Sequence, residues 1–257
     1  MSKATIRPVL RRAALAAALA TALPGDAAPL GAQARPRPDS LRLTGPSAGA
    51  ARIEGRVRIG RALGARRPRF RIYGEGAGAV APRAPEESPL RNVVVYLEGL
   101  PRTAAPLGAH PRATVEQRAE RFSPHVLPVV AGTSVAFPNE DAIFHNVFSL
   151  SEPRVFDLGR YAKGESKSVR FDRTGVVKVF CHIHSDMSAV VLVLDTPAYT
   201  VPDADGRYLF EGVPAGDYTL VAWHERAEPV RRRVRVGAGG TIVEHLDIPI
   251  IEDARRE

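Results

Sequence analysis

Sulfur-bearing residues are scarce in this sequence. It holds one cysteine, Cys181, and two methionines, Met1 and Met187. A single cysteine cannot form a disulfide within the chain, so a fold stapled by internal disulfides is excluded. Unless it is simply a small buried apolar residue, Cys181 is left to bind a metal as a thiolate or to pair with another chain.

Aromatic residues are also few, at 6% of the chain, and they do not accompany the basic residues. The formal charge is +8, and the only tight basic run is Arg231-Arg232-Arg233. A surface that binds nucleic acid would interleave basic and aromatic side chains. We therefore predict no nucleic-acid partner.

Apolar runs of membrane-spanning length, about 20 residues, do not occur in the sequence. The short apolar stretch from Ala13 to Ala20 follows Arg11-Arg12 and precedes the small-x-small site Ala32-Gln33-Ala34. These are the three parts of a cleavable signal peptide, which we place at residues 1–34. We expect a periplasmic or secreted protein with no membrane span after signal cleavage.

The cysteine lies in an unusual loop, Phe180-Cys181-His182-Ile183-His184-Ser185-Asp186-Met187, between strand-like apolar runs at 176–180 and 189–194. His184 follows Cys181 by three residues, and Met187 follows His184 by three. A thiolate, an imidazole and a thioether can therefore converge on one ion. That combination of ligands suits copper.

A copper site of this kind needs a second imidazole. His145, within Phe144-His145-Asn146-Val147-Phe148, precedes Cys181 by 36 residues and follows a strand expected at 135–139. We take His145 as the missing ligand. Each of these residues alone is more often a packing residue, so the metal prediction rests on their joint spacing.

The Cys-x-x-His-x-x-Met loop, with the earlier His145-Asn146 pair, resembles the cupredoxins, and its short spacing resembles amicyanin. The resemblance covers roughly residues 114–195. It implies one type 1 copper, held by Cys181, His145 and His184 with Met187 as a long axial ligand. It also implies electron exchange with a redox partner protein, conducted through His184 near the surface.

The resemblance gives roles to residues around the predicted ligands as well. The Asn146 side chain is expected to tie the two ligand loops together by a hydrogen bond. An apolar shell that limits the access of water is expected from Phe144, Phe148, Phe180 and Ile183.

Other copper functions fit the sequence less well. A multicopper oxidase would need a histidine on both sides of the cysteine, but Phe180 precedes Cys181, and a dinuclear copper site would need two cysteines in the loop. We therefore predict that the protein is not an enzyme. A periplasmic copper carrier or sensor, and a non-catalytic structural β-sandwich that binds a partner, remain as alternatives.

A second pattern begins after Thr196-Pro197. Asp205-Gly206-Arg207 and Pro214-Ala215-Gly216-Asp217-Tyr218 are turns that each lead into a strand. They resemble the carboxypeptidase regulatory-like, prealbumin-type β-sandwich. The first two strands of that family correspond to Gly55-Arg56-Val57 and to residues 92–97, which would make this sandwich discontinuous, although a simple N-terminal extension of the copper domain is equally open.

Short strands punctuated by Gly and Pro, without a long amphipathic helix, predict an all-β chain. The predicted fold is a Greek-key cupredoxin β-sandwich with a smaller antiparallel β-sandwich module. The domain boundaries that we expect are a signal peptide at 1–34, a disordered leader at 35–51, N-terminal strands and loops at 52–112, the copper domain at 113–195, the regulatory-like sandwich at 196–251 and a tail at 252–257.

Overall fold

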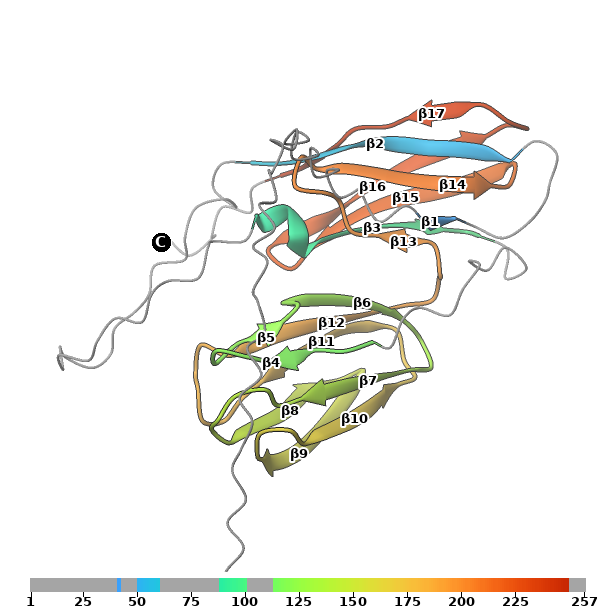
Figure 1. Cartoon of the computed structure of the whole chain (residues 1–257). Coiled ribbons are helices and arrows are strands. Elements are labelled where there is room, and N and C mark those ends of the chain that lie inside the picture. Colours follow the sequence, from blue (N-terminus) through green and yellow to red (C-terminus); the bar gives the residue numbers. More distant parts are fainter. Residues whose placement is uncertain (1–40, 43–49, 61–87, 101–112, 250–257) are drawn as a thin grey trace, which may run out of the picture. The chain divides into compact units, whose positions relative to one another are not determined.

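The computed structural model describes residues 41–42, 50–60, 88–100 and 113–249 (Figure 1). Nearly all of their regular structure is β-strand, with one short 3-10 helix, Pro89–Asn92. The prediction of an all-β fold is therefore confirmed. The predicted signal peptide, most of the leader, and the C-terminal tail lie outside the described residues. No helix within the described ranges combines the length and the apolar character needed to cross a membrane.

The first sandwich holds the residues predicted to bind copper. Its larger sheet has the order β6-β12-β11-β8-β9, and its smaller sheet pairs β10 with β7. The first β-strand of the larger sheet, β6, runs parallel to β12, while the other neighbours are antiparallel. The bounds are β6 (Val126–Val130), β7 (Thr133–Pro138), β8 (His145–Ser151), β9 (Arg154–Tyr161), β10 (Ser166–Phe171), β11 (Gly175–Phe180) and β12 (Ser188–Leu194). A short hairpin of β4 (Glu116–Gln117) and β5 (Phe122–Ser123) lies before them in the chain.

The second sandwich is made of strands from both sides of the first one in the sequence. One sheet pairs β2 (Ala51–Ile59) with β14 (Arg207–Val213), and the other has the order β13-β3-β15-β16. Its remaining bounds are β1 (Leu41–Arg42), β3 (Val93–Glu98), β13 (Tyr199–Thr200), β15 (Gly216–His224), β16 (Ala227–Val236), β17 (Thr241–Val243) and β18 (Leu246–Ile248). Of the two arrangements that the sequence left open, these pairings correspond to the discontinuous one.

Not every pair in the second sandwich is antiparallel. β17 and β18 both pair parallel to β2, and β1 pairs parallel to β14. Parallel neighbours need a long connection rather than a tight turn. That condition is met for β2 and β17 because the whole first sandwich lies between them in the sequence.

Two strands, β9 and β16, do not follow from the apolar runs in the sequence. Both are at the edge of their sheets, and at least half of the residues in each are exposed. In β16 the buried residues Val230, Val234 and Val236 are interrupted by the Arg231-Arg232-Arg233 run. An edge strand tolerates such charges because one side of it faces solvent.

β12 has apolar residues on both faces, and the two faces belong to two different buried clusters. Ala189, Val191 and Val193 belong to the core of that sandwich. The alternate residues Val190, Leu192 and Leu194 belong to a separate buried cluster. Their partners in that cluster come from β3, β6 and β15: Val94, Tyr96, Val126, Val221 and Trp223.

This cluster yields a first prediction. Trp223→Ala removes a large side chain that is only 7% exposed, so we expect a loss of about 3–5 kcal/mol in the free energy of unfolding. Leu150→Ala is the control: Leu150 is 77% exposed, and we expect a change within about 0.5 kcal/mol. Denaturant unfolding measures both, and equal effects of the two substitutions would contradict the role given to the cluster.

Candidate metal centre

The loop with the cysteine joins two paired strands. Phe180, the last residue of β11, pairs with Ser188, the first residue of β12, so residues 181–187 form the connection. The Cys181 N–H donates to the Met187 carbonyl at 3.2 Å, and the Met187 N–H donates to the His184 carbonyl at 3.1 Å. The loop is therefore closed on itself by backbone hydrogen bonds.

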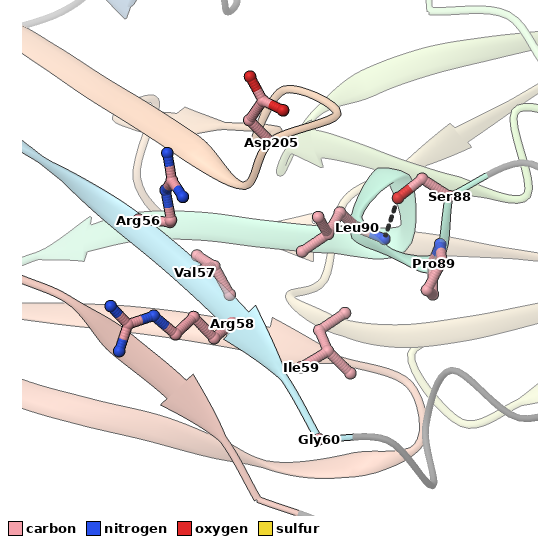
Figure 2. A pocket seen from close by; sticks show the side chains of 9 residues that line it. All are labelled: Arg56, Val57, Arg58, Ile59, Gly60, Ser88, Pro89, Leu90 and Asp205. Atoms are coloured by element: carbon pink, nitrogen blue, oxygen red, sulfur yellow. Dashed lines mark hydrogen bonds between the residues drawn. The ribbon is translucent and has the colours of Figure 1, made fainter.

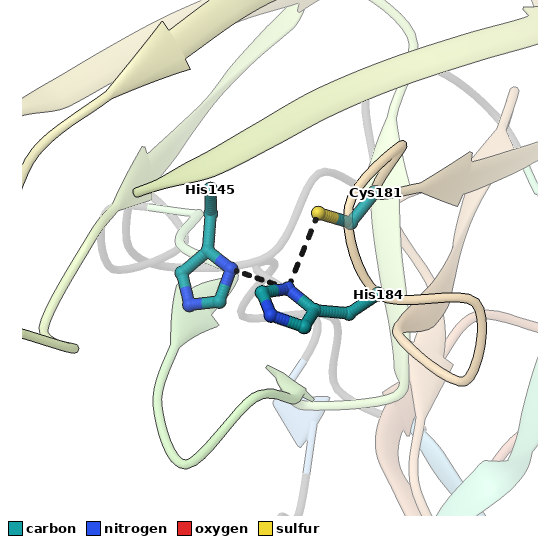
Figure 3. A group of neighbouring side chains, drawn as sticks. All are labelled: His145, Cys181 and His184. Carbon is teal, nitrogen blue, oxygen red and sulfur yellow. Dashed lines mark hydrogen bonds between the residues drawn. The ribbon is translucent and has the colours of Figure 1, made fainter. Parts of the chain in front are cut away.

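His145 enters the site from a different strand. It is the first residue of β8, and β8 pairs with β11 through Phe148 and Phe180. This pairing brings together residues that are 36 positions apart in the sequence. The imidazole of His145 is completely buried, and Figure 3 shows it facing Cys181 and His184.

Three of the four predicted ligands form one cluster. The Nδ1 atoms of His145 and His184 are 3.2 Å apart, and the Cys181 Sγ is 3.8 Å from the His184 Nδ1 (Figure 3). One ligand-type atom from each of the three residues lies within 4.8 Å of the others. A cysteine sulfur and two imidazoles thus lie close together.

Both separations are shorter than the sum of two usual metal–ligand bonds, which are about 2.0 Å to nitrogen and about 2.3 Å to sulfur, so one ion could contact these atoms. The thiolate and imidazole donors are those of a blue-copper site, so the residues present fit copper.

The fourth predicted ligand, Met187, is also buried beside this cluster. It is 1% exposed and belongs to the same apolar core as Cys181. Its backbone is bonded to both Cys181 and His184, as described above. Met187 is therefore held by the backbone of the ligand loop and lies in the core that also contains Cys181.

The two histidines of the loop have different surroundings. The His182 side chain is 56% exposed, and its ring stacks on Phe148 with centroids 3.7 Å apart and an interplanar angle of 1°. The His184 side chain is 22% exposed and faces the cluster. The assignment of His184, rather than His182, to the metal group agrees with this geometry.

A carboxylate contacts the outer nitrogen of His145. The His145 Nε2 is 2.8 Å from the Asp141 Oδ2. Burial raises the pKa of the Asp141 carboxyl, but hydrogen bonds from the Glu120 N–H, from His145 and from the Ala119 N–H outweigh it, so that the pKa is lowered. Asp141 therefore stays ionised and can only accept hydrogen bonds. We did not identify it from the sequence, although its position four residues before His145 was an available signal.

The expected role of Asn146 is not the one observed. Its Nδ2 donates to the Asp157 Oδ1 on β9 at 2.7 Å, and its buried Oδ1 has no hydrogen-bond partner among the described residues. The side chain therefore does not tie the two ligand loops together. An ionised carboxylate is a stronger acceptor than a neutral backbone carbonyl, which explains the preference for Asp157.

The residues expected to form an apolar shell around the cluster are mostly exposed. Phe144 is 60% exposed, and Ile183 and Phe180 are exposed too, so these side chains are not part of the buried core. Phe148 is half-buried and stacks on His182. The buried apolar residues that share a core cluster with Cys181 and Met187 are others, among them Phe137 and Val179. The reason is strand alternation: Phe180 points outward because its neighbour Val179 points into the core.

A pocket near the end of β2 has different chemistry. Arg56, Arg58, Ile59, Leu90 and Asp205 are among its lining residues (Figure 2). Two of its three charged side chains already lie near an opposite charge, since Arg58 is 3.9 Å from Asp247 and Asp205 is 3.7 Å from Arg207. No cysteine or histidine lines it, and so the metal cluster remains the stronger candidate site.

Comparisons with known proteins find similarity at the level of solved structures. No family model matches the chain, and no curated protein matches it. A Cu-containing nitrite reductase from Thermus scotoductus SA-01 is similar over 36% of this chain, with 25% identity and a TM-score of 0.33. A variant of amicyanin with Cu(I) is similar over 34% (21% identity, TM-score 0.31), and a purple cupredoxin from Nitrosopumilus maritimus over 32% (26% identity, TM-score 0.30).

The chain spans about a quarter of the nitrite reductase, at 24%, but 87% of the amicyanin and 99% of the purple cupredoxin. Because each similarity is confined to about a third of this chain, the metal site stands on its own side-chain geometry. The resemblance of residues 196–251 to the regulatory-like family stays a prediction.

The different surroundings of the two loop histidines give a second prediction. His184→Ala removes a cluster nitrogen, so we expect copper affinity to fall at least tenfold in titration calorimetry. His182→Ala removes an exposed ring and is the matched control, with an affinity close to that of the unmodified protein. Equal losses in the two variants would mean that the assignment of the ligand histidine is wrong.

Proposed function

We propose that this chain is an exported type 1 copper protein that carries single electrons between redox partner proteins. The observation that carries the proposal is the convergence of the Cys181 Sγ with the Nδ1 atoms of His145 and His184. Bound copper would supply the one-electron couple. Cys181, His145 and His184 would hold it, and Met187 would supply a thioether as a fourth, weaker ligand.

The burial of the ligands supports electron transfer with little rearrangement. His145 is fully buried, Met187 nearly so, and the ligand loop is closed by backbone hydrogen bonds. Rigid supports keep ligand positions constant while the charge on the ion changes. A small structural change on oxidation is what fast electron exchange requires.

His184 is the residue through which we expect electrons to pass. It is the only one of the three clustered residues that is not buried, and its side chain is 22% exposed. Ile183, next to His184 in the sequence, is an exposed apolar residue. Ile143 and Phe144, which directly precede His145, are exposed as well. A redox partner protein that docked there would approach the site at its most accessible ligand.

The alternative of a copper carrier or sensor is less well supported. A carrier must release its ion to an acceptor, which is easier when the ligands are exposed and mobile. Here two of the three clustered residues are buried, and His145 is held by Asp141 as well as by its strand. A non-catalytic structural sandwich would leave the convergence of three metal-binding side chains without a purpose. We propose no enzymatic reaction for the site.

The proposal predicts the colour of the protein. Oxidised protein with one copper per chain should show an intense visible band, because a short thiolate–copper bond gives charge transfer in that region. Cys181→Ser should abolish the band and most of the affinity, whereas Met187→Leu should retain colour with a shifted reduction potential. Metal analysis measures the copper content, a thiol assay checks Cys181, and visible spectroscopy records the band. A colourless Cu(II) protein with an intact thiol would refute the type 1 assignment.

Electron transfer and copper transfer also differ in rate. We expect the loaded protein to exchange electrons with a small redox protein, or between its own two oxidation states, faster than it passes copper to a metal-free acceptor. Line broadening in NMR spectra of mixed oxidation states measures the first rate, and copper analysis after separation from the acceptor measures the second. Faster transfer of copper than of electrons would support the carrier instead.

A further inference from the structure

The turn between β4 and β5 has a costly backbone conformation. Ala119 and Glu120 have φ angles of 52° and 55°, in the left-handed region that residues other than glycine and asparagine rarely adopt. The flanking residues Arg118 and Arg121 exchange two backbone hydrogen bonds, at 2.9 and 3.2 Å, which close the hairpin. Such a conformation persists only when surrounding contacts hold it, and it often marks a functional site.

Asp141 supplies those contacts. Its Oδ1 accepts from the Ala119 N–H at 2.6 Å, and its Oδ2 accepts from the Glu120 N–H at 2.9 Å. The Asp141 N–H in turn donates to the Asn139 Oδ1 at 2.9 Å. One carboxylate, whose side chain is 15% exposed, thus fixes the strained turn and is itself fixed.

The same carboxylate reaches the metal cluster. The Asp141 Oδ2 also contacts the His145 Nε2 at 2.8 Å. Both oxygens of Asp141 already accept backbone N–H groups of the turn, so the carboxylate acts as the acceptor here and the His145 Nε2 carries the proton of this contact. In a neutral imidazole this leaves a lone pair on Nδ1, which is the atom that faces Cys181 and His184.

The turn places a second carboxylate near the other imidazole. The Glu120 Oε2 lies 3.9 Å from the His184 Nε2. The Glu120 side chain is 63% exposed, whereas the Asp141 side chain is largely buried, so the contact with Asp141 is the better defined of the two. The outer nitrogens of both clustered histidines therefore face negative charge, with Asp141 as the fixed element.

We propose that Asp141 is a positioning residue of the copper site. Its carboxylate selects the His145 tautomer whose Nδ1 can bind the ion, and its negative charge favours Cu(II) over Cu(I), which lowers the reduction potential. Only the effect on the reduction potential rests on the proposed copper function. The tautomer is a property of the metal-free protein.

The test compares Asp141→Asn with Glu140→Gln. Both substitutions remove one negative charge from the same loop, but Glu140 is exposed, and its side chain is not in the carboxylate contact with His145. In nitrogen-15 NMR of the metal-free protein, we expect one His145 tautomer, protonated at Nε2, in the unmodified chain and in Glu140→Gln. We expect a mixture of tautomers in Asp141→Asn.

In the copper-loaded protein, Asp141→Asn should have a higher reduction potential than Glu140→Gln and about tenfold to hundredfold weaker copper binding. Asp141→Glu, which restores the charge, should recover part of both. An unchanged tautomer, or a potential equal to that of Glu140→Gln, would overturn the proposal. If no variant binds copper, the proposed function fails, and the tautomer measurement still decides whether Asp141 orients His145.

Loss of folding in Asp141→Asn is a separate risk, because Asp141 also holds the strained turn. The double substitution Ala119→Asn, Glu120→Gly supplies residues that favour two left-handed positions. The comparison of Asp141→Asn with Asp141 is then repeated in that background. The same change of tautomer is expected there, and its absence would show that Asp141 serves the turn alone.

Discussion

The pairing of β8 with β11 is the constraint on which the candidate site depends. His145 begins β8 and Cys181 directly follows β11, so the register Phe148–Phe180 decides how far apart the two side chains lie. A shift of one residue would turn His145 from the core to the opposite face of the sheet. The separations of 3.2 and 3.8 Å within the cluster are therefore consequences of sheet register.

The strand that follows the ligand loop, β12, is packed on both of its faces. β12 follows Met187 and carries six consecutive buried residues, Ala189 to Leu194, half of which face the core of the first sandwich and half a cluster shared with β3 and β15. Continuous apolar runs of this kind are typical of strands that are buried on both faces. The ligand loop is thus anchored at a strand that the second sandwich helps to bury.

This packing indicates a structural role for the second sandwich. The sequence patterns gave it no role in the stability of the first sandwich. Without β15, however, Val190, Leu192 and Leu194 lose Val221 and Trp223 as neighbours. Because such burial stabilises each apolar side chain by about 1.5–3 kcal/mol, we interpret the second sandwich first as structural support.

Local signals in the sequence determined the all-β class, most strands and the candidate residues. Cys181, His184 and Met187 share one loop, where spacing alone brings them close, and the alternation of apolar residues around them indicates strands. Tertiary structure decided what depends on long-range pairing. The approach of His145, the contact of Asp141 with it, the turn of Asn146 toward Asp157 and the outward direction of Phe180 all follow from which strands are neighbours and in which register. A sequence pattern describes one strand at a time, whereas these contacts join residues on different strands, and only the folded sheet specifies them.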